Sequence, residues 1–132
     1  GMLVVHASWF RFSRPEHVDL PEGEWRHGLH GGAVETAMMM HLRADLVRGL
    51  QSAQAHSLGQ ELEETLRRVG PEGAASFSWL AGDLNPGGAV GDATLADGDM
   101  GARLVSHYGT VLAEVIEDVR AFPLDRLAED AT

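Results

Sequence analysis

The sequence predicts a layered α/β domain. Three segments repeat apolar residues at the spacing of a helix, and two short segments carry the β-branched, aromatic or alternating residues that favour strands. In chain order they give strand, loop, helix, helix, strand, loop and helix. Two strands are few, because an average sheet has roughly five or six. We therefore expect the chain to contain only part of a sheet.

The first half of the chain is expected to form a strand, a loop and a helix. Residues 3–7 read Leu-Val-Val-His-Ala, a short apolar and β-branched run that is typical of a strand. Residues 11–32 contain prolines and glycines without a hydrophobic period, which predicts a long loop, and such loops are usually functional or mobile. Residues 33–48 are rich in helix formers, with Gly49 as the stop. The apolar stripe of this helix is Val34, Met38 and Leu42.

The middle of the chain is expected to contain a linker, a helix, a strand and a second loop. Residues 51–57 are small and polar, as in a linker, and residues 58–69 repeat apolar residues at helical spacing before Gly-Pro. Residues 75–80 alternate aromatic residues with serine, which predicts a strand. Residues 82–98 are rich in glycine and include Asn-Pro-Gly-Gly, a turn signal.

The last helix has the clearest pattern. Asp97 is a suitable N-cap, Asp99 adds negative charge to the first turn, and Phe122-Pro123 ends the segment. Between them runs a continuous apolar stripe formed by Met100, Leu104, Tyr108, Val111, Leu112, Val115, Ile116 and Val119.

The composition excludes several classes of function. The 132 residues carry a formal net charge of −10, no lysine and no cysteine. An acidic chain without lysine is a poor candidate for binding nucleic acid or an anionic membrane, and Schiff-base and disulfide chemistry are excluded. Without a long apolar run or a signal peptide, we expect a cytoplasmic protein. Gly1 before Met2 is typical of the residue left by removal of an affinity tag.

The richest candidate site is residues 25–36, where two histidines lie in a glycine-rich loop that leads into a helix. His30 is placed to act as a general acid or base, and Glu35 to orient it or to bind substrate. Gly31 and Gly32 would let the backbone approach a ligand closely. The simpler alternative is that Glu35 complements the helix dipole and that His30 is an ordinary loop residue.

Two further interpretations concern neighbouring residues. His27, His30 and Glu35 could together ligate a metal, although their spacing matches no standard zinc pattern. Trp9 and Trp25 flank the long loop and could close over a substrate. The sequence contains no nucleophile elbow, phosphate loop or dinucleotide fingerprint.

Two separated motifs resemble the creatininase (creatinine amidohydrolase) family. Residues 30–39, His-Gly-Gly-Ala-Val-Glu-Thr-Ala-Met-Met, are similar to its His-(Ala/Gly)-Gly-x-x-Glu-Thr-Ser helix. Residues 83–96 resemble its Gly-Asp-(Pro/Ala) loop before the last helix, and residues 120–124 fit as well. The likeness extends over about residues 3–127, which correspond to roughly the C-terminal half of a family member.

The resemblance implies a partial three-layer α/β/α creatininase-like domain with a mostly parallel sheet, its N-terminal strands missing, so that residues 1–132 form one partial domain. Family members are metal-dependent amidohydrolases of cyclic amides and related C–N bonds, often hexameric, with two divalent metals, zinc or manganese. Their ligands come from a Glu-x-His segment, a following Asp and an Asn-Gly-His-x-x-Asn segment, and these motifs are not in this sequence. No metal is therefore expected on this chain alone.

The residues that the resemblance carries over are on the substrate side. His30 matches the family histidine that assists proton transfer at the scissile amide, and Glu35 matches the glutamate of the Glu-Thr pair. Trp9 matches a tryptophan of the pocket wall. Trp25 resembles a mobile-loop tryptophan, with one residue more between it and His30 than in creatininase, and Ala37 replaces the usual serine.

Two functions follow from these observations. The chain is either the substrate-side part of an amidohydrolase, inactive alone and acting on a small-molecule amide when complete, or a non-catalytic remnant that oligomerises or binds a ligand. In both cases a homo-oligomer is expected, because an incomplete sheet exposes strand edges and apolar faces.

Overall fold

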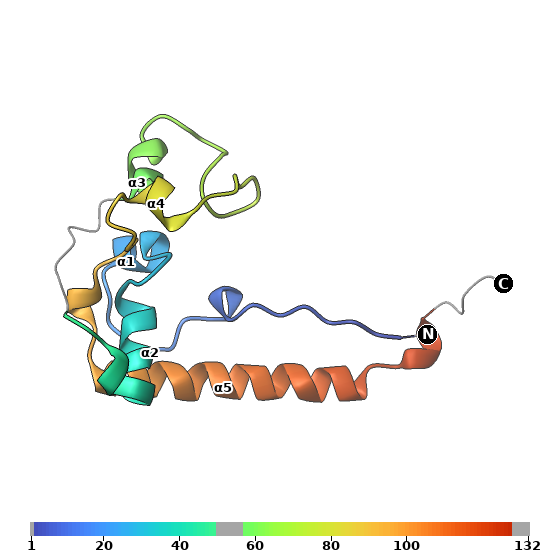
Figure 1. Ribbon diagram of the computed structural model, residues 1–132. Coiled ribbons are helices and arrows are strands. Elements are labelled where there is room, and N and C mark those ends of the chain that lie inside the picture. The colour runs from blue at the N-terminus through green and yellow to red at the C-terminus, as the bar shows by residue number, and fades with distance from the viewer. Residues whose placement is uncertain (1, 50–56, 128–132) are drawn as a thin grey trace.

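The computed structural model describes residues 2–49 and 57–127. In this part of the chain the regular elements are helical (Figure 1). The α-helices are α1 (Glu22–His27), α2 (Ala33–Arg43), α3 (Leu58–Glu63), α4 (Ala81–Leu84) and α5 (Gly98–Ala121), and the 3₁₀ turns are η1 (Trp9–Arg11), η2 (Ala44–Leu46), η3 (Ala93–Leu95) and η4 (Leu124–Arg126).

The predicted three-layer α/β/α architecture with a parallel sheet is wrong for the described residues, which contain no strand. Their β-type pairing is limited to two isolated bridges, His30 with Val90 and Gly70 with Ser76. Residues 3–7 have strand-like composition but no regular secondary structure, and of residues 75–80 only Ser76 is bridged. The physical reason is that β-propensity reflects packing in a sheet, so it produces a strand only where a neighbouring strand pairs with it.

The core lies where α2 crosses the N-terminal end of α5. Ala33, Val34 and Ala37 of α2 are buried against Met100 and Leu104 of α5. The helices approach closely at Gly101, where a Cβ would collide with the backbone carbonyl of Ala37. Val18, Leu20 and Ala96 complete this core.

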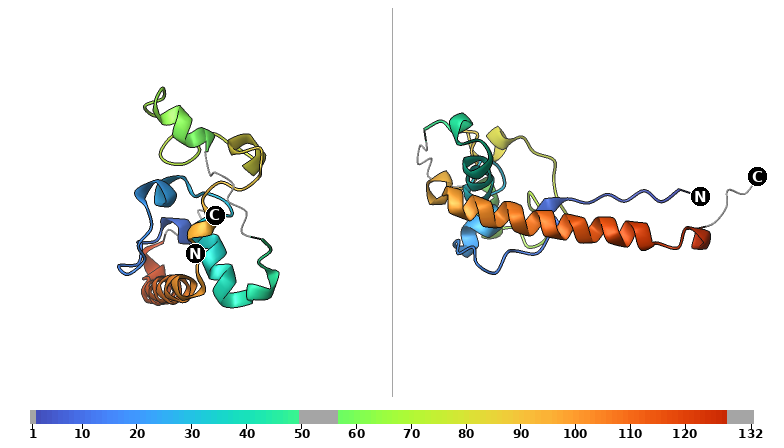
Figure 2. Two further views of the ribbon diagram at one scale, coloured as in Figure 1. Left: turned by 90° about the vertical axis from the view of Figure 1, so that its left-hand side faces the viewer. Right: turned by 90° about the horizontal axis from the view of Figure 1, so that it is seen from below.

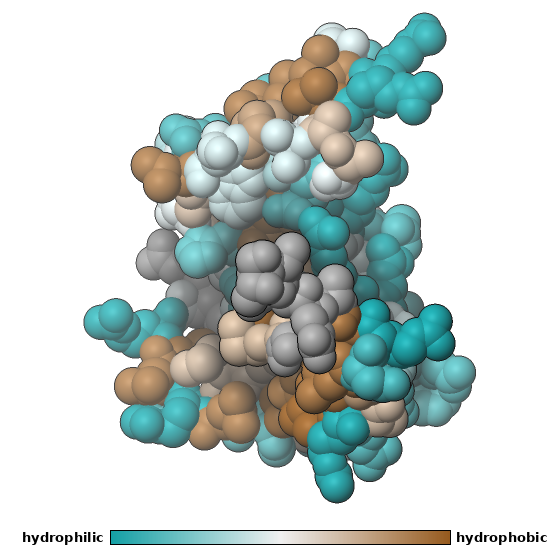
Figure 3. Space-filling view, turned by 90° about the vertical axis from the view of Figure 1, so that its right-hand side faces the viewer, coloured by the Kyte–Doolittle hydropathy of each residue, from teal (hydrophilic) through white to brown (hydrophobic). Residues whose placement is uncertain are grey.

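Helix α5 confirms its prediction. The Asp97 carboxylate accepts a hydrogen bond of 2.7 Å from the amide of Met100, and the helix ends before Phe122-Pro123. Its C-terminal part projects beyond the rest of the structure, and the extended N-terminal segment runs along the same side (Figures 1 and 2). The side chains of Leu112, Ile116 and Val119 are exposed there. Figure 3 faces this projecting end and shows apolar side chains on it.

The other helices are shorter than predicted, or were not predicted. The helix expected over residues 33–48 ends at Arg43 and continues as η2, and that expected over residues 58–69 ends at Glu63. Because residues 64–69 are exposed, little packing opposes the fraying of a short helix there. The predicted loops contain α1, α4 and η3, which are too short to show a hydrophobic period. Of the predicted linker at 51–57, only Ser57, the N-cap of α3, lies within the described residues.

None of the helices described is both long and apolar enough to cross a membrane.

Candidate functional site

The two sequence motifs meet at one point in the structure. His30 and Val90 form an antiparallel bridge, with hydrogen bonds of 3.0 Å from the His30 amide to the Val90 carbonyl and 2.6 Å in the other direction. This bridge joins the loop before α2 to the glycine-rich segment before α5. The candidate site is thus built from two parts of the chain that are sixty residues apart.

A buried carboxylate, Glu24 of α1, holds the same two segments together. One of its oxygens accepts a hydrogen bond of 2.7 Å from the amide of Ala33, and the other accepts one of 2.8 Å from the amide of Asp92. Its exposed fraction is only 8%. Because both amides would otherwise be buried without partners, Glu24 fixes the start of α2 relative to residues 90–92.

Three glycines surround the Glu24 side chain. A Cβ on Gly28, Gly32 or Gly91 would come too close to the Glu24 carboxylate. Gly28 and Gly32 have negative φ angles, so their backbone conformation does not require glycine; the lack of space does. The sequence analysis missed Glu24, and glycines grouped near an acidic residue were the signal for it.

Glu35 and His30 lie next to each other at the start of α2. Glu35 Oε2 accepts a hydrogen bond of 2.5 Å from the amide of Gly31, and His30 Nδ1 lies 3.9 Å from the same oxygen. That separation is too long for a hydrogen bond but short enough for an attraction between charges. The His30 side chain is 59% exposed and the Glu35 side chain 30%, so both are accessible to a ligand.

A cavity of about 520 Å³ adjoins these two residues. It is lined by Trp9, His30, Gly31, Glu35, Thr36, Met38, Met39, Leu42, Leu46 and Val47. Four of the residues predicted to form the site, His30, Glu35, Trp9 and Gly31, therefore share one cavity. Its size is in the range of small-molecule sites, which runs from about 300 to 1,000 Å³.

Gly32 and Trp25 lie outside this cavity. Gly32 is buried against Glu24 and Gly91. Trp25 packs against the core, and the Arg14 guanidinium lies 5.2 Å from the centroid of its ring. In this structure Gly32 and Trp25 contribute to the framework of the loop.

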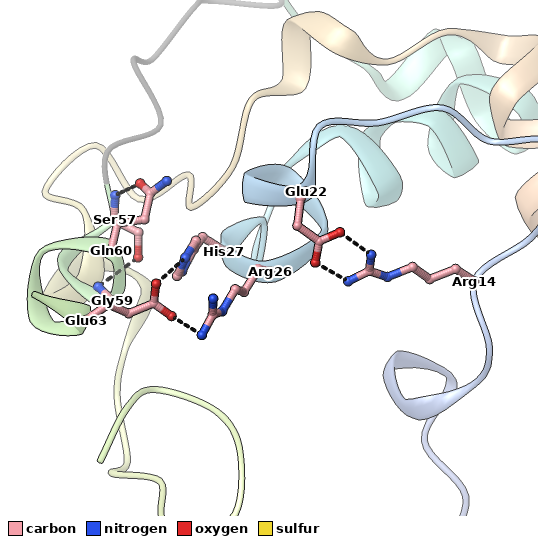
Figure 4. A network of polar contacts seen from close by, with 8 residues as sticks. All are labelled: Arg14, Glu22, Arg26, His27, Ser57, Gly59, Gln60 and Glu63. Carbon is pink, nitrogen blue, oxygen red and sulfur yellow. Dashed lines mark hydrogen bonds and ion pairs between the residues drawn. The ribbon is translucent and has the colours of Figure 1, made fainter. Parts of the chain in front are cut away.

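His27 points away from the candidate site, toward α3 (Figure 4). Its Nε2 lies 3.3 Å from a carboxylate oxygen of Glu63, and the other oxygen of Glu63 pairs with Arg26 at 2.8 Å. His27 therefore does not join His30 and Glu35 as a metal ligand. Over residues 2–49 and 57–127, no three histidine, aspartate or glutamate side chains converge as a metal site would require.

The resemblance to creatininases implies two divalent metals, and the described side chains do not fit them. His30 and Glu35 offer two donor groups, and Glu35 Oε2 is already used by the Gly31 amide. Typical zinc sites have at least three protein ligands. These residues are therefore arranged to contact a substrate, and they do not form a metal centre by themselves.

The comparison with protein-family models supports the motif interpretation. Residues 1–116 of the 132-residue chain match the family model described as creatinine amidohydrolase. No curated protein and no solved structure matches the chain significantly. Since the match spans most of the chain and includes both segments that meet at the candidate site, this chain belongs to the creatininase family.

Proposed function

We propose that His30, Gly31 and Glu35 form the substrate side of an amidohydrolase site for a cyclic amide or a related C–N bond. The observation that carries the proposal is that His30 and Glu35 adjoin each other on one accessible cavity, within the segment that matches the family. A neutral imidazole can accept a proton or, once protonated, donate one to a leaving nitrogen. His30 is the group assigned to that transfer.

Glu35 is assigned two roles. Its hydrogen bond to the Gly31 amide holds the loop that carries His30. Its charge, 3.9 Å from His30 Nδ1, attracts the positive charge that the imidazole acquires on protonation. A substrate carbonyl or ring nitrogen would lie between the His30 ring and the Trp9 side of the cavity.

The proposal assigns the metal ligands to polypeptide outside this sequence. It is supported by the poor fit of the described side chains to a metal and by the absence from the sequence of the ligand motifs that the resemblance implies. Divalent metals would supply an activated water when bound. The 132-residue chain alone is therefore expected to be inactive.

The test is a cyclic-amide hydrolysis assay with metal analysis, on this chain and on a form extended upstream in its reading frame. The extended form should bind metal and hydrolyse the amide, and His30→Ala or Glu35→Gln should lower its rate by about 100-fold or more. His17→Ala, an exposed histidine outside the site cavity, is the control and should leave the rate unchanged. Hydrolysis by the 132-residue chain alone would overturn the proposal.

A second candidate function is favoured by the exposed apolar stripe of α5. Leu112 and Ile116 are 47% and 53% exposed, and such surface is usually covered by a partner. The chain would then be a non-catalytic module that associates with further copies through α5. Size-exclusion chromatography with light scattering should show an oligomer that Ile116→Glu dissociates, and a monomer at all concentrations would exclude this function.

A further inference from the structure

The site cavity has a polar end and an apolar arm. Its polar end is formed by His30, Gly31 and Glu35. From Glu35 the lining continues along one face of α2 through Met38, Met39 and Leu42, which lie three, four and seven residues further on. These spacings place their side chains on the same face of the helix as Glu35. Leu46 and Val47 extend the apolar arm beyond the end of α2.

The apolar arm is not part of the protein core. Met39, Leu42 and Leu46 are 39%, 57% and 54% exposed, whereas α2 packs on α5 through a different face that includes Ala33 and Ala37. Exposed apolar surface that continues directly from a polar site is well suited to bind the apolar part of a ligand.

Charged groups are kept off this surface. Arg43 and Asp45, which are neighbours of the arm in the sequence, pair with each other at 2.8 Å, and neither lines the cavity. The charged and titratable side chains of the cavity, His30 and Glu35, are confined to its polar end. The two ends therefore favour different parts of one ligand.

We propose that the substrate is an amide that carries an apolar substituent, with its amide at His30 and Glu35 and its substituent along Met38, Met39 and Leu42. This inference rests on the proposed function for the polar end and specifies the substrate class. A small polar cyclic amide without a substituent would leave the arm in contact with water. Since each buried methylene strengthens binding about fourfold, an aryl or branched alkyl group should improve affinity by tenfold or more.

The experiment compares two probes that differ only in the substituent, hydantoin and 5-benzylhydantoin. The intact chain is labelled with ¹³C-methyl methionine, and both probes are titrated into it by NMR. 5-Benzylhydantoin should shift the methyl signals of Met38 and Met39 and bind at least tenfold more tightly than hydantoin. Met100 in the core and Met2 at the N-terminal end should not shift, because neither lines the cavity.

A pair of leucine variants tests where the substituent lies. Leu42→Gln should remove most of the benzyl preference, and because Leu42 is exposed the variant should keep the fold. Leu80→Gln, an equally simple change at a leucine that is 76% exposed and outside the site cavity, should leave the preference intact. Equal affinity for the two hydantoins, or Met38 and Met39 signals that do not move, would overturn the inference.

Two further outcomes separate this inference from related ideas. If the Met38 and Met39 signals shift with protein concentration in the absence of probe, a second copy of the chain covers the arm and the inference is wrong. If 5-benzylhydantoin binds as expected but the upstream-extended form hydrolyses no amide, the proposed function fails while the binding preference stands. Hydrolysis of unsubstituted cyclic amides with no gain from an apolar group would have the opposite meaning.

Discussion

The Glu24 carboxylate accepts a hydrogen bond from the amide of Asp92, a residue 68 positions later in the chain, at 2.8 Å. Its other oxygen accepts the amide of Ala33 at the start of α2. One side chain from a short helix thus links the two segments that carry the family motifs. In the absence of a sheet among the described residues, this link and the His30–Val90 bridge hold the site together.

Replacing Glu24 by alanine should destabilise the protein strongly. The amides of Ala33 and Asp92 would lose their partner, and a buried amide without a hydrogen bond costs roughly 1–3 kcal/mol. We expect the free energy of unfolding, measured by urea titration, to fall by about 3 kcal/mol. Glu24→Gln should have a smaller effect, because the oxygen of the new amide can still accept one hydrogen bond.

The control for this prediction is Glu22→Gln in the same short helix. Glu22 is exposed and pairs with Arg14 at 2.6 Å (Figure 4), and exposed ion pairs contribute little to stability. If the Glu22 and Glu24 variants unfold at the same urea concentration, the structural role assigned to Glu24 is wrong.

Two glycines of α5 should respond to alanine with opposite signs. At Gly101 a Cβ would collide with the backbone of Ala37, so Gly101→Ala should push α2 and α5 apart and cost about 3 kcal/mol. At Gly109 a Cβ meets nothing, so Gly109→Ala should stabilise the helix by up to about 1 kcal/mol. Thermal unfolding followed by circular dichroism measures both, and similar shifts in Tm would contradict the close helix crossing.

The adjacent Gly31 and Gly32 should differ in the same way for other reasons. Gly31 has a φ of +64° but open space around it, so Gly31→Ala should cost only the backbone strain of about 1–2 kcal/mol. Gly32 has an ordinary φ, but a Cβ there would collide with the Glu24 carboxylate, which two amides hold in place. Gly32→Ala should therefore cost more, about 3 kcal/mol, in the same urea titration. An equal cost at both positions would show that space around Glu24 is not limiting.

Tyr108 gives a direct measure of how the N-terminal segment packs on α5. Burial raises the pKa of its phenol above the ordinary value of 10.0, and the smaller opposing effect is the charge of Arg14. A raised pKa means that the folded state holds the proton more tightly than the unfolded state. The corresponding stability is therefore fully present below pH 10.0 and is lost as the pH rises through the higher folded pKa.

The tyrosinate absorbance near 295 nm should accordingly rise with a midpoint above pH 10.0. Tyr108 is the only tyrosine in the sequence, so the titration is unambiguous. The ring centroid of Trp9 lies 5.2 Å from that of Tyr108, and Trp9→Ala should lower the midpoint toward 10.0 by admitting water. An unchanged midpoint in this variant would mean that Trp9 does not shield the phenol.

The parts of the fold that were predictable are those with long-range periodicity or a strong local signal. Helix α5 has a 24-residue period and an aspartate cap, and α2 has a stripe at four-residue spacing, so both were found. Residues 3–7 misled, because their β-branched composition indicates a preference that only a paired neighbouring strand can realise. Helix α1 was hidden in a predicted loop because its six residues are too few for a period.

At the site, the identities of the residues were easier to predict than their contacts. The sequence pointed to His30, Glu35, Trp9 and Gly31, which line one cavity. It could not show that Glu24 reaches Asp92, because a contact between residues so far apart leaves no local pattern. The ion pair that turns His27 toward Glu63 depends likewise on where α3 packs.

The distance along the chain between His30 and Val90 also determines the order of folding events. Helix α5 consists of contacts within a few residues and can form quickly, whereas the His30–Val90 bridge must first close a loop of sixty residues at a cost in chain entropy. Helical circular dichroism should therefore recover before the site does. During refolding the chain would pass through a period in which its longest helix is present while the two halves of its pocket have not yet met.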